Sequence, residues 1–276
     1  MKKTLSVLGL AFLAFVGAGC NKLKSRDALN QGVQAYRNAR YSAAVDLFKT
    51  AVALDPDNSN GRLYLATAYM SQYIPGADTP ENVQMAKAAR DEFMRVLEKN
   101  PNDKLALASL ANIAYQQAQG VPELEKKFQR LDEAKEWYRK LVAADPQNKE
   151  AYYSLGVIDW AETYPIRTTA RVKLGMKPED PGPIKDKKVK EELRARNLPM
   201  VEDGIKNFQK ALEIDPNYDD AMSYINLIYR ERADLADNPE GYKKDSDMAD
   251  SWVQKSLDTK KMKAAKQPVT GISAEK

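Results

Sequence analysis

One stretch of this sequence occurs twice, at residues 41–56 and 201–216. Each copy has a small residue, an aromatic residue four positions later and an aliphatic residue three positions after that, and each ends in Asp-Pro. Steps of four and three place these side chains on one face of a helix, and the proline pushes its predecessor out of the helical region. Each copy is therefore expected to be an amphipathic helix with a defined stop.

Two further copies end at residues 100–101 and 145–146, and a second helical pattern follows each proline. A small residue in the middle of that second pattern allows a neighbouring helix to approach closely. These pairs of expected helices resemble the tetratricopeptide repeat, a helix-turn-helix unit of about 34 residues. The first copy keeps the signature residues of that family, which are Gly32, Tyr41, Ala44, Phe48, Ala51 and Pro56.

The resemblance implies an all-α fold, a right-handed superhelical solenoid of about five such repeats with lengthened hairpins. The expected units are residues 25–58, 59–103, 104–148, 149–218 and 219–263. Extra residues inside the second, third and fifth units are expected to form longer helices joined by a turn, because Thr79-Pro80 is typical of a helix start. Residues 264–276 lack apolar periodicity and are expected to form a disordered tail.

The fourth unit carries the largest insertion, residues 161–200, and this insertion is rich in basic side chains. Its three prolines between residues 178 and 183 are expected to prevent regular structure there. Residues 187–196 are then expected to form one short charged helix. Two interpretations remain open, in which the insertion is either a contact arm or lid over the rest of the unit, or a solvated surface excursion.

The N-terminus has the pattern of an export signal. Two lysines precede an uncharged, mostly apolar run that ends in small residues just before Cys20, the only cysteine in the chain. The run is shorter than the roughly 20 apolar residues of a membrane-spanning helix, so residues 1–19 are expected to be a cleaved signal. The junction resembles the lipobox of bacterial lipoproteins, which implies lipidation of Cys20, with residues 20–24 as the tether. Ordinary signal cleavage beside an incidental cysteine is the alternative.

Composition argues against several classes of function. The chain has no histidine, and it has no glycine-rich phosphate loop, nucleophile elbow or paired-cysteine metal site, so neither an enzyme nor a cofactor or metal site is predicted. The carboxylates on the expected helices are interpreted as solvated. The formal net charge of +4 comes from residues 161–200 and the C-terminal tail, so nucleic-acid binding by the folded body is not expected.

The tetratricopeptide resemblance also implies a binding surface. In that family the concave face, lined by the first helix of each pair, binds peptides or partner proteins. The matching positions in this sequence are Tyr36, Met70, Asn112, Tyr115, Tyr153, Trp160 and Arg230. Large apolar side chains predominate among them, which is typical of interaction sites, although a stripe at helical spacing is also compatible with a core covered by the insertion.

The leading hypothesis is a non-catalytic scaffold, lipid-anchored in the outer membrane and facing the periplasm, that binds another envelope protein or peptide. A soluble periplasmic or secreted location is the alternative. Asn21, where retained lipoproteins of that family have aspartate, favours the outer membrane. The alternative function is a carbohydrate-binding lipoprotein in which Tyr115, Tyr153 and Trp160 stack on sugar rings.

Overall fold

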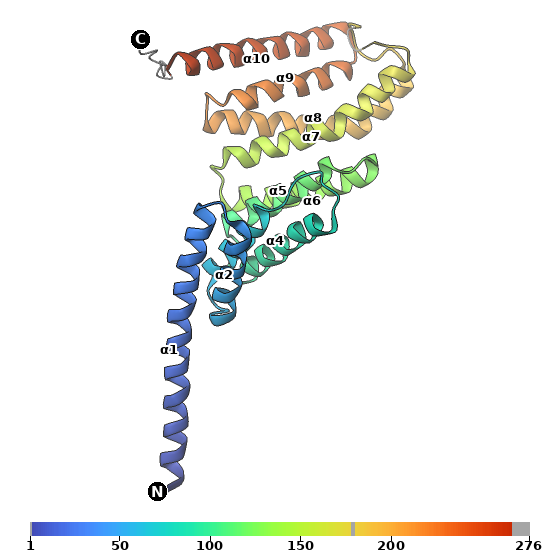
Figure 1. Cartoon of the computed structure of the whole chain (residues 1–276). Helices are drawn as coiled ribbons and strands as arrows, with labels where there is room; N and C mark the ends of the chain where they lie inside the picture. The colour runs from blue at the N-terminus through green and yellow to red at the C-terminus, as the bar shows by residue number, and fades with distance from the viewer. Residues whose placement is uncertain (1, 178–179, 267–276) are drawn as a thin grey trace, which may run out of the picture. The chain divides into compact units, whose positions relative to one another are not determined.

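The computed structural model describes residues 2–177 and 180–266, with side chains from residue 20 onward. These residues form helices and connecting turns, without a strand among them (Figure 1). The helices are α1 (Lys2–Arg37), α2 (Tyr41–Leu54), α3 (Ser59–Met70), α4 (Pro80–Lys99), α5 (Lys104–Gln119), α6 (Leu124–Ala144), α7 (Lys149–Lys173), α8 (Lys187–Ile214), α9 (Asp219–Asp234) and α10 (Pro239–Lys266). The all-α prediction is confirmed.

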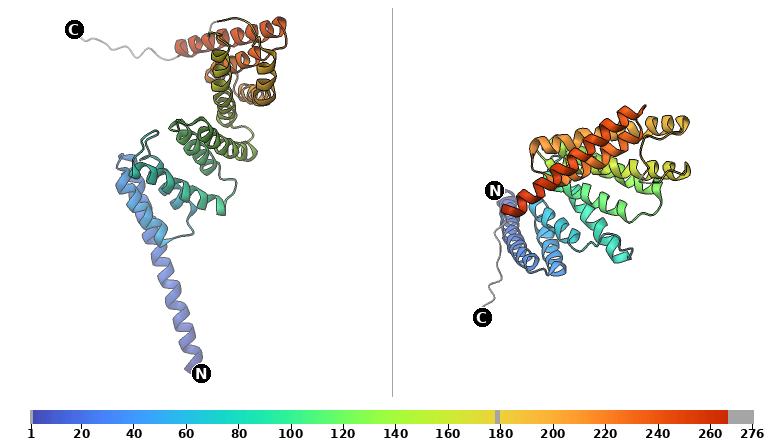
Figure 2. Two further views of the ribbon diagram at one scale, coloured as in Figure 1. Left: turned by 90° about the vertical axis from the view of Figure 1, so that its right-hand side faces the viewer. Right: turned by 90° about the horizontal axis from the view of Figure 1, so that it is seen from above.

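The chain divides into two compact units, Met1–Lys140 and Leu141–Lys276. In the first unit, α1 packs on α2, α2 on α3, α3 on α4 and α4 on α5. In the second unit, α7 packs on α8, α8 on α9 and α9 on α10, and α7 also contacts α9 (Figure 2). Within the second unit, the first helices of two successive hairpins therefore lie against one another.

Helices α3, α5, α7 and α9 begin at the four positions where the sequence places the starts of the second to fifth repeats. A short turn after Asp-Pro or Asn-Pro brings a polar residue to the cap position of the next helix. In three of the four turns its side chain accepts a hydrogen bond from the backbone N–H three residues on, which satisfies a donor that the helix cannot pair. These caps are Asn58 to Gly61 at 3.1 Å, Asp103 to Ala106 at 3.0 Å and Asn148 to Ala151 at 2.9 Å.

In the first and fourth hairpins, an aromatic side chain of the second helix packs against a glycine of the first helix. Phe48 and Phe208 are 1% and 0% exposed. A methyl group added at Gly32 would lie 2.5 Å from the Phe48 ring, and one added at Gly156 would lie 2.7 Å from the Phe208 ring. Glycine is therefore needed at both positions for the ring to fit.

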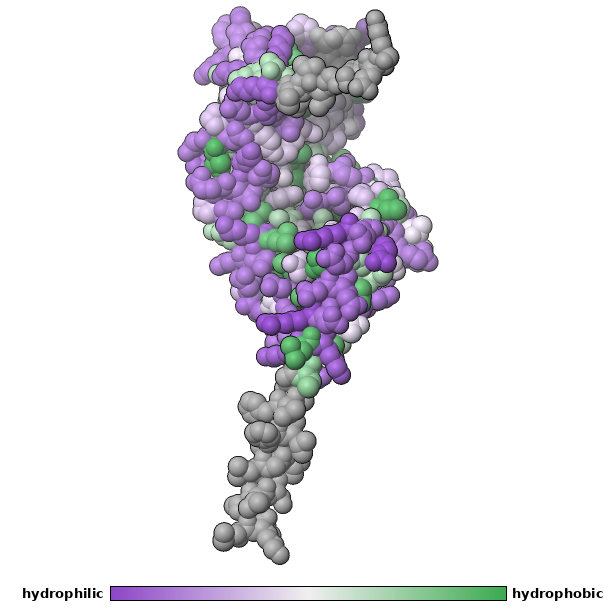
Figure 3. Space-filling view, turned by 60° about the vertical axis from the view of Figure 1, so that its left-hand side comes forward, coloured by the Kyte–Doolittle hydropathy of each residue, from purple (hydrophilic) through white to green (hydrophobic). Residues whose placement is uncertain are grey.

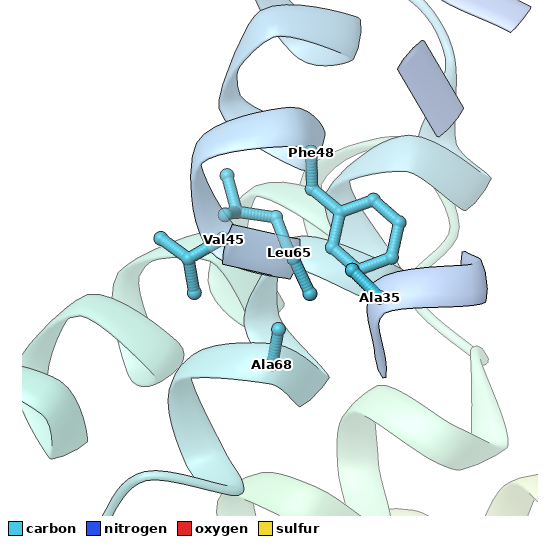
Figure 4. Packing of buried hydrophobic residues seen from close by; sticks show 6 residues of the cluster. Ala35, Val45, Phe48, Leu65 and Ala68 are labelled. Carbon is cyan, nitrogen blue, oxygen red and sulfur yellow. The ribbon is translucent and has the colours of Figure 1, made fainter. Parts of the chain in front are cut away.

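Around Phe48 the core continues into the next repeat. Val45 from α2 and Leu65 and Ala68 from α3 form one buried cluster with Phe48 and Ala35 (Figure 4). This cluster joins three successive helices, so the first hairpin buries its apolar face on the second, as expected for stacked repeats.

The lengthening of the hairpins differs from one unit to the next. In the fifth unit, α9 and α10 are joined by residues 235–238 alone, as expected. In the second unit the prediction of a single turn is wrong, because residues 71–79 form a longer connection that contains Pro75 and Gly76, the latter with φ +81°. Asn82 holds this connection, with its Nδ2 donating to the carbonyls of Ile74 at 2.8 Å and Ala77 at 2.7 Å.

The insertion at residues 161–200 also differs from its prediction. Residues 161–173 continue α7, and the expected short helix 187–196 is wrong because α8 runs without a break from Lys187 to Ile214. Pro199 lies inside α8 and removes only one backbone donor, whereas Leu193, Asn197 and Val201 keep the buried face continuous across it. The insertion therefore lengthens the hairpin at both of its helices.

The tip of this lengthened hairpin has its own small core. Ile184 and Leu193 pack with Leu235, which follows the end of α9, and all three are at most 6% exposed. The Ile184 N–H donates to the carbonyl of Asp234 at 3.0 Å. The tip is therefore attached to the fifth repeat, and the interpretation as a solvated excursion is wrong.

The C-terminal boundary also moves. Helix α10 continues to Lys266, so the prediction that the tail starts at residue 264 is wrong by three residues. Alanine and lysine are strong helix formers, and the first helix-breaking residue is Pro268. The rest of the expected tail, residues 267–276, lies outside the described residues.

The surface is mainly hydrophilic on the face seen in Figure 3, where hydrophobic residues lie scattered between polar ones. The exposed large hydrophobic side chains come from many different helices, for example Tyr64 in α3, Met94 in α4 and Leu257 in α10. Isolated exposures of this kind are normal on folded proteins and do not by themselves mark a binding site.

Replacing either ring that closes a hairpin tests the packing. Phe48→Ala and Phe208→Ala are each expected to lower the free energy of unfolding by about 3–5 kcal/mol, because a fully buried ring is lost and a cavity remains. Denaturant unfolding of the purified protein measures this loss. Leu257→Ala, on an exposed position of α10, is the control and is expected to change stability by no more than about 0.5 kcal/mol. A loss below about 1 kcal/mol at both rings would contradict this packing.

Candidate functional site

The groove residues predicted in the first unit lie on the first helices of its hairpins. Tyr36, Met70, Asn112 and Tyr115 are each partly buried and partly accessible. The Tyr36 hydroxyl lies 2.8 Å from Ser71 Oγ, just beyond the end of α3, and its ring contacts the Tyr41 ring at a centroid distance of 5.2 Å. Tyr36 thus joins the first two repeats besides presenting an accessible surface.

In the second unit the predicted residues lie on α7 and α9, within a group of aromatic rings. The Tyr153 ring contacts Tyr218 and Tyr224, with centroid distances of 5.2 and 5.6 Å, as well as Phe208. The Trp160 ring contacts Tyr224 at 5.6 Å. Tyr153 is engaged by three other rings, which makes it a poor platform for a sugar ring.

Trp160 and Arg230, which occupy the same position of the fourth and fifth repeats, line one cavity of about 230 Å³. We call it the α7/α9 pocket. Its remaining lining comes largely from the part of α7 added by the insertion and from the adjoining α9. The lining residues are Trp160, Tyr164, Arg167, Thr168, Arg171, Val172, Met176, Leu227, Arg230 and Glu231.

The insertion therefore builds a wall of the pocket. Tyr164, which lies in the insertion, is 42% exposed, and its ring lies beside that of Trp160 at a centroid distance of 5.0 Å. Trp160 itself is only partly buried. The insertion therefore does not bury Trp160, and the interpretation of this residue as part of a covered core is wrong.

Beneath this wall lies a group of charged side chains between α7 and α9. Arg167 donates from Nε to Glu231 Oε2 at 2.8 Å and from Nη1 to Asp234 Oδ2 at 2.5 Å. Arg171 donates from Nη1 to Asp234 Oδ1 at 2.8 Å, and from Nη2 to the carbonyls of Lys177 and Asp180, both at 2.8 Å. The two arginines therefore fasten the lengthened part of α7 and the loop after it to the end of α9.

Two members of this group, Arg171 through Nε and Glu231 through Oε1, each leave one buried atom without a hydrogen-bond partner among the described residues. The Glu231 side chain is 2% exposed. Burial raises the pKa of Glu231 to about 7, since the loss of hydration outweighs the opposing attraction of Arg167 and Arg171, and Asp234 adds to the rise. This carboxyl group therefore changes its charge close to neutral pH.

Sequence reasoning missed these charged residues and misjudged the carboxylates. Glu231 and Asp234 are buried, so the interpretation of helix carboxylates as solvated is wrong for both. Their spacing of three residues places them on one face of α9, and the spacing of four residues between Arg167 and Arg171 does the same on α7. The opposite charges on α7 and α9 could have indicated these ion pairs. The sequence alone, however, does not show that the charged faces of the two helices meet.

Cys20, the expected lipidation site, lies in α1 with an exposed side chain. Among the described residues we find no helix with the length and apolar character needed to traverse a lipid bilayer.

Comparison with known proteins agrees with this architecture. A family model described as tetratricopeptide repeat matches residues 29–73 and 86–149. The fold is that of a tetratricopeptide-repeat solenoid. No curated protein matches the sequence.

Solved structures of MamA share this fold at low sequence identity. One is 14% identical, with 90% of this chain and 98% of that chain covered and a TM-score of 0.51. MamA 41-end from Desulfovibrio magneticus RS-1 is 18% identical over 87% of this chain and 96% of its own, with a TM-score of 0.51. MamA AMB-1 is 16% identical over 89% and 98%, with a TM-score of 0.53. Tetratricopeptide solenoids generally act as scaffolds for protein–protein interaction.

The pKa of Glu231 gives a stability test. Because the pKa of Glu231 in the folded protein, about 7, lies above its usual value of 4.5, its contribution to stability is full below pH 4.5 and is lost as the pH rises through 7. Glu231→Gln cannot titrate, so the wild type is expected to lose up to about 3 kcal/mol relative to this variant between pH 4.5 and 8.

Urea unfolding at several pH values measures this difference. The matched control is Glu202→Gln, which makes the same change at an exposed position of α8 and is expected to follow the wild type at every pH. Parallel curves for the wild type and Glu231→Gln would show that Glu231 does not titrate with a raised pKa.

Proposed function

We propose that this chain is a non-catalytic scaffold of the bacterial cell envelope that captures a partner protein or peptide, with the α7/α9 pocket as its anchor point. The observation that carries the proposal is the meeting of Trp160 and Arg230 in one pocket. They occupy equivalent positions of successive repeats, the positions that bind ligands in tetratricopeptide proteins, although seventy residues of sequence separate them.

The chemistry of the pocket supports this role. Tryptophan and arginine are the side chains most often found at the energetic centre of protein interfaces. Trp160 and Leu227 supply apolar contact area, while Arg230 has a side chain that is 45% exposed and makes an ion pair with Asp250 at 2.6 Å. A pocket of about 230 Å³ with an accessible aromatic wall suits one inserted side chain better than a large cofactor.

A single substitution tests the pocket. Trp160→Ala is expected to weaken the purified partner's binding by at least about 2 kcal/mol, because it removes the central aromatic contact. Its effect on thermal stability is expected to be much smaller than that of Phe208→Ala, since Trp160 is partly exposed. The partner is first captured from detergent-solubilised envelopes, and binding is then measured by calorimetry.

Trp252→Ala is the matched control, because Trp252 is also a partly buried tryptophan of the second unit but lies outside the pocket. It is expected to leave affinity unchanged. Equal affinity of the wild type and Trp160→Ala for the captured partner would remove the pocket from the binding site. A glycan array probed with the same proteins tests the carbohydrate alternative.

The anchor is a separate part of the proposal, and it rests on Cys20 and the export-signal pattern before it. Lipoproteins of this type carry several acyl chains, which bind a bilayer firmly, whereas one chain binds it marginally. Cys20→Ala is expected to move the protein from the membrane fraction to the soluble fraction of fractionated cells. Cys20→Ser, which keeps the size of the side chain, is expected to do the same. A wild-type protein that is already soluble would contradict the anchor.

A further inference from the structure

The first hairpin carries a local excess of positive charge. Residues 20–54 contain six lysines and arginines against two aspartates, whereas the whole chain is nearly balanced, with 43 basic and 39 acidic residues. Five of the six cations lie on α1 or in the turn after it, and all five side chains are exposed. They are Lys22, Lys24, Arg26, Arg37 and Arg40.

These five cations lack counter-ions within the protein. None of them makes an ion pair with another described residue. In the second hairpin, by contrast, Arg62, Arg90 and Arg95 each pair with a glutamate. Asp27, the carboxylate of α1, accepts instead from Gln31 Nε2 at 2.9 Å. The positive potential of this hairpin therefore favours an anion from outside the chain.

Four of the cations form a continuous surface. Lys22, Arg26 and Arg37 share one side of α1, because their spacings of four and eleven residues are close to whole helical turns. At the end of this row, Arg37 and Arg40 line an open groove of about 690 Å³ between α1 and α2, and the other residues that line it are uncharged. We call the surface formed by Lys22, Arg26, Arg37 and Arg40 the basic face.

The proposed anchor would hold this hairpin close to a membrane. Ser25 is fully buried, and its hydroxyl donates to the carbonyl of Ala51 at 2.7 Å, so the packed hairpin begins only five residues after Cys20. Five residues span about 8 Å as a helix and at most about 18 Å when extended. The Debye length at physiological ionic strength is also about 8 Å, so cations beside the anchor interact with lipid headgroups.

Resting on the proposed anchor at Cys20, we propose that the basic face lies on the bilayer and binds the phosphate groups of anionic phospholipids. Lys22 and Arg37 are about 22 Å apart along the helix axis, so α1 lies along the membrane surface when both reach the headgroups. Arginine suits this role because its guanidinium group binds phosphate through two parallel N–H donors.

The short tether favours a bilayer over an acidic protein as the occupant. A small folded domain is about 30 Å across, which is more than the roughly 18 Å that the tether spans at full extension. A folded partner on the basic face would therefore compete with the membrane for the same space. Leu23, which is 67% exposed between two lysines, adds an apolar side chain at the point nearest to the bilayer.

Vesicle binding without an acyl chain tests the inference. The protein is the mature chain, residues 20–276, with Cys20→Ser. It is expected to sediment with vesicles of phosphatidylethanolamine and phosphatidylglycerol, but not with vesicles of phosphatidylcholine, because only the former carry net negative charge. Raising the NaCl concentration from about 0.05 M to about 0.5 M is expected to release the protein, since salt screens exposed charges.

Variants connect vesicle binding to the basic face. The double substitution Arg37→Gln, Arg40→Gln is expected to weaken partition into phosphatidylglycerol vesicles by about thirtyfold, since each basic side chain at an anionic surface contributes about fivefold. The double substitution Lys22→Gln, Arg26→Gln is expected to have the same effect. Circular dichroism confirms that both variants are folded.

The matched control removes the same charge elsewhere. Lys244 and Lys261 are exposed on α10, and Lys244→Gln, Lys261→Gln is expected to bind vesicles as the parent protein does. Fluorescein-labelled poly-glutamate tests an acidic protein surface as the occupant. Binding of poly-glutamate without binding of phosphatidylglycerol vesicles would overturn the inference.

The remaining outcomes also decide. Equal binding to both kinds of vesicle, or equal losses in the control and the basic-face variants, would overturn the inference. Binding that depends on Lys22 and Arg26 but not on Arg37 and Arg40 would overturn it as well, because α1 would then touch the membrane only at its anchored end. The anchor is decided separately by fractionation of cells with Cys20→Ala, since the vesicle assay uses a chain without acyl groups.

Discussion

The contact between an aromatic ring and a glycine, made across the first and the fourth hairpin, is the constraint on which the fold depends. A glycine at residue 32 or 156 lets the facing helix approach until the ring of Phe48 or Phe208 fills the space of the missing side chain. Such close packing fixes the separation of the two helices. Because the two helices of the hairpin are held at that separation, their apolar side chains can pack on the next hairpin. Val45 and Leu65 make such a contact in the first unit.

The same contact explains why so much of the fold could be predicted from sequence. The spacing between small, aromatic and aliphatic residues, and the proline at the end of each copy, are local patterns whose consequences are also local. The insertion was harder to predict, because a proline such as Pro199 breaks a helix in an isolated segment but is tolerated inside a packed one. The buried side chains on either side of it, Leu193 and Val201, keep the helix intact, and that packing is tertiary.

The pocket was predictable only in part, for a related reason. Trp160 and Arg230 follow from the repeat register, since equivalent positions of neighbouring repeats lie side by side. Glu231 and Asp234 do not follow from it, because the energetic cost of a buried carboxylate can be judged only when its partners are known. Arg167 and Arg171 meet them through an insertion that other repeats lack. Burial of a carboxylate is tolerated where several close ion pairs compensate for its lost hydration. Oε1 of Glu231 lacks this compensation, because it has no hydrogen-bond partner among the described residues.

The attachment of Ile184 and Arg171 to the end of α9 has a consequence for how this protein can change over time. Repeat proteins are usually regarded as modular, so that a unit can be gained, lost or shortened with little effect on the next one. Here the fourth unit cannot be trimmed to standard length without exposing Leu235 and leaving Asp234 buried without its cations. The fourth and fifth units therefore have to be inherited together, as one block of sequence with a shared interior.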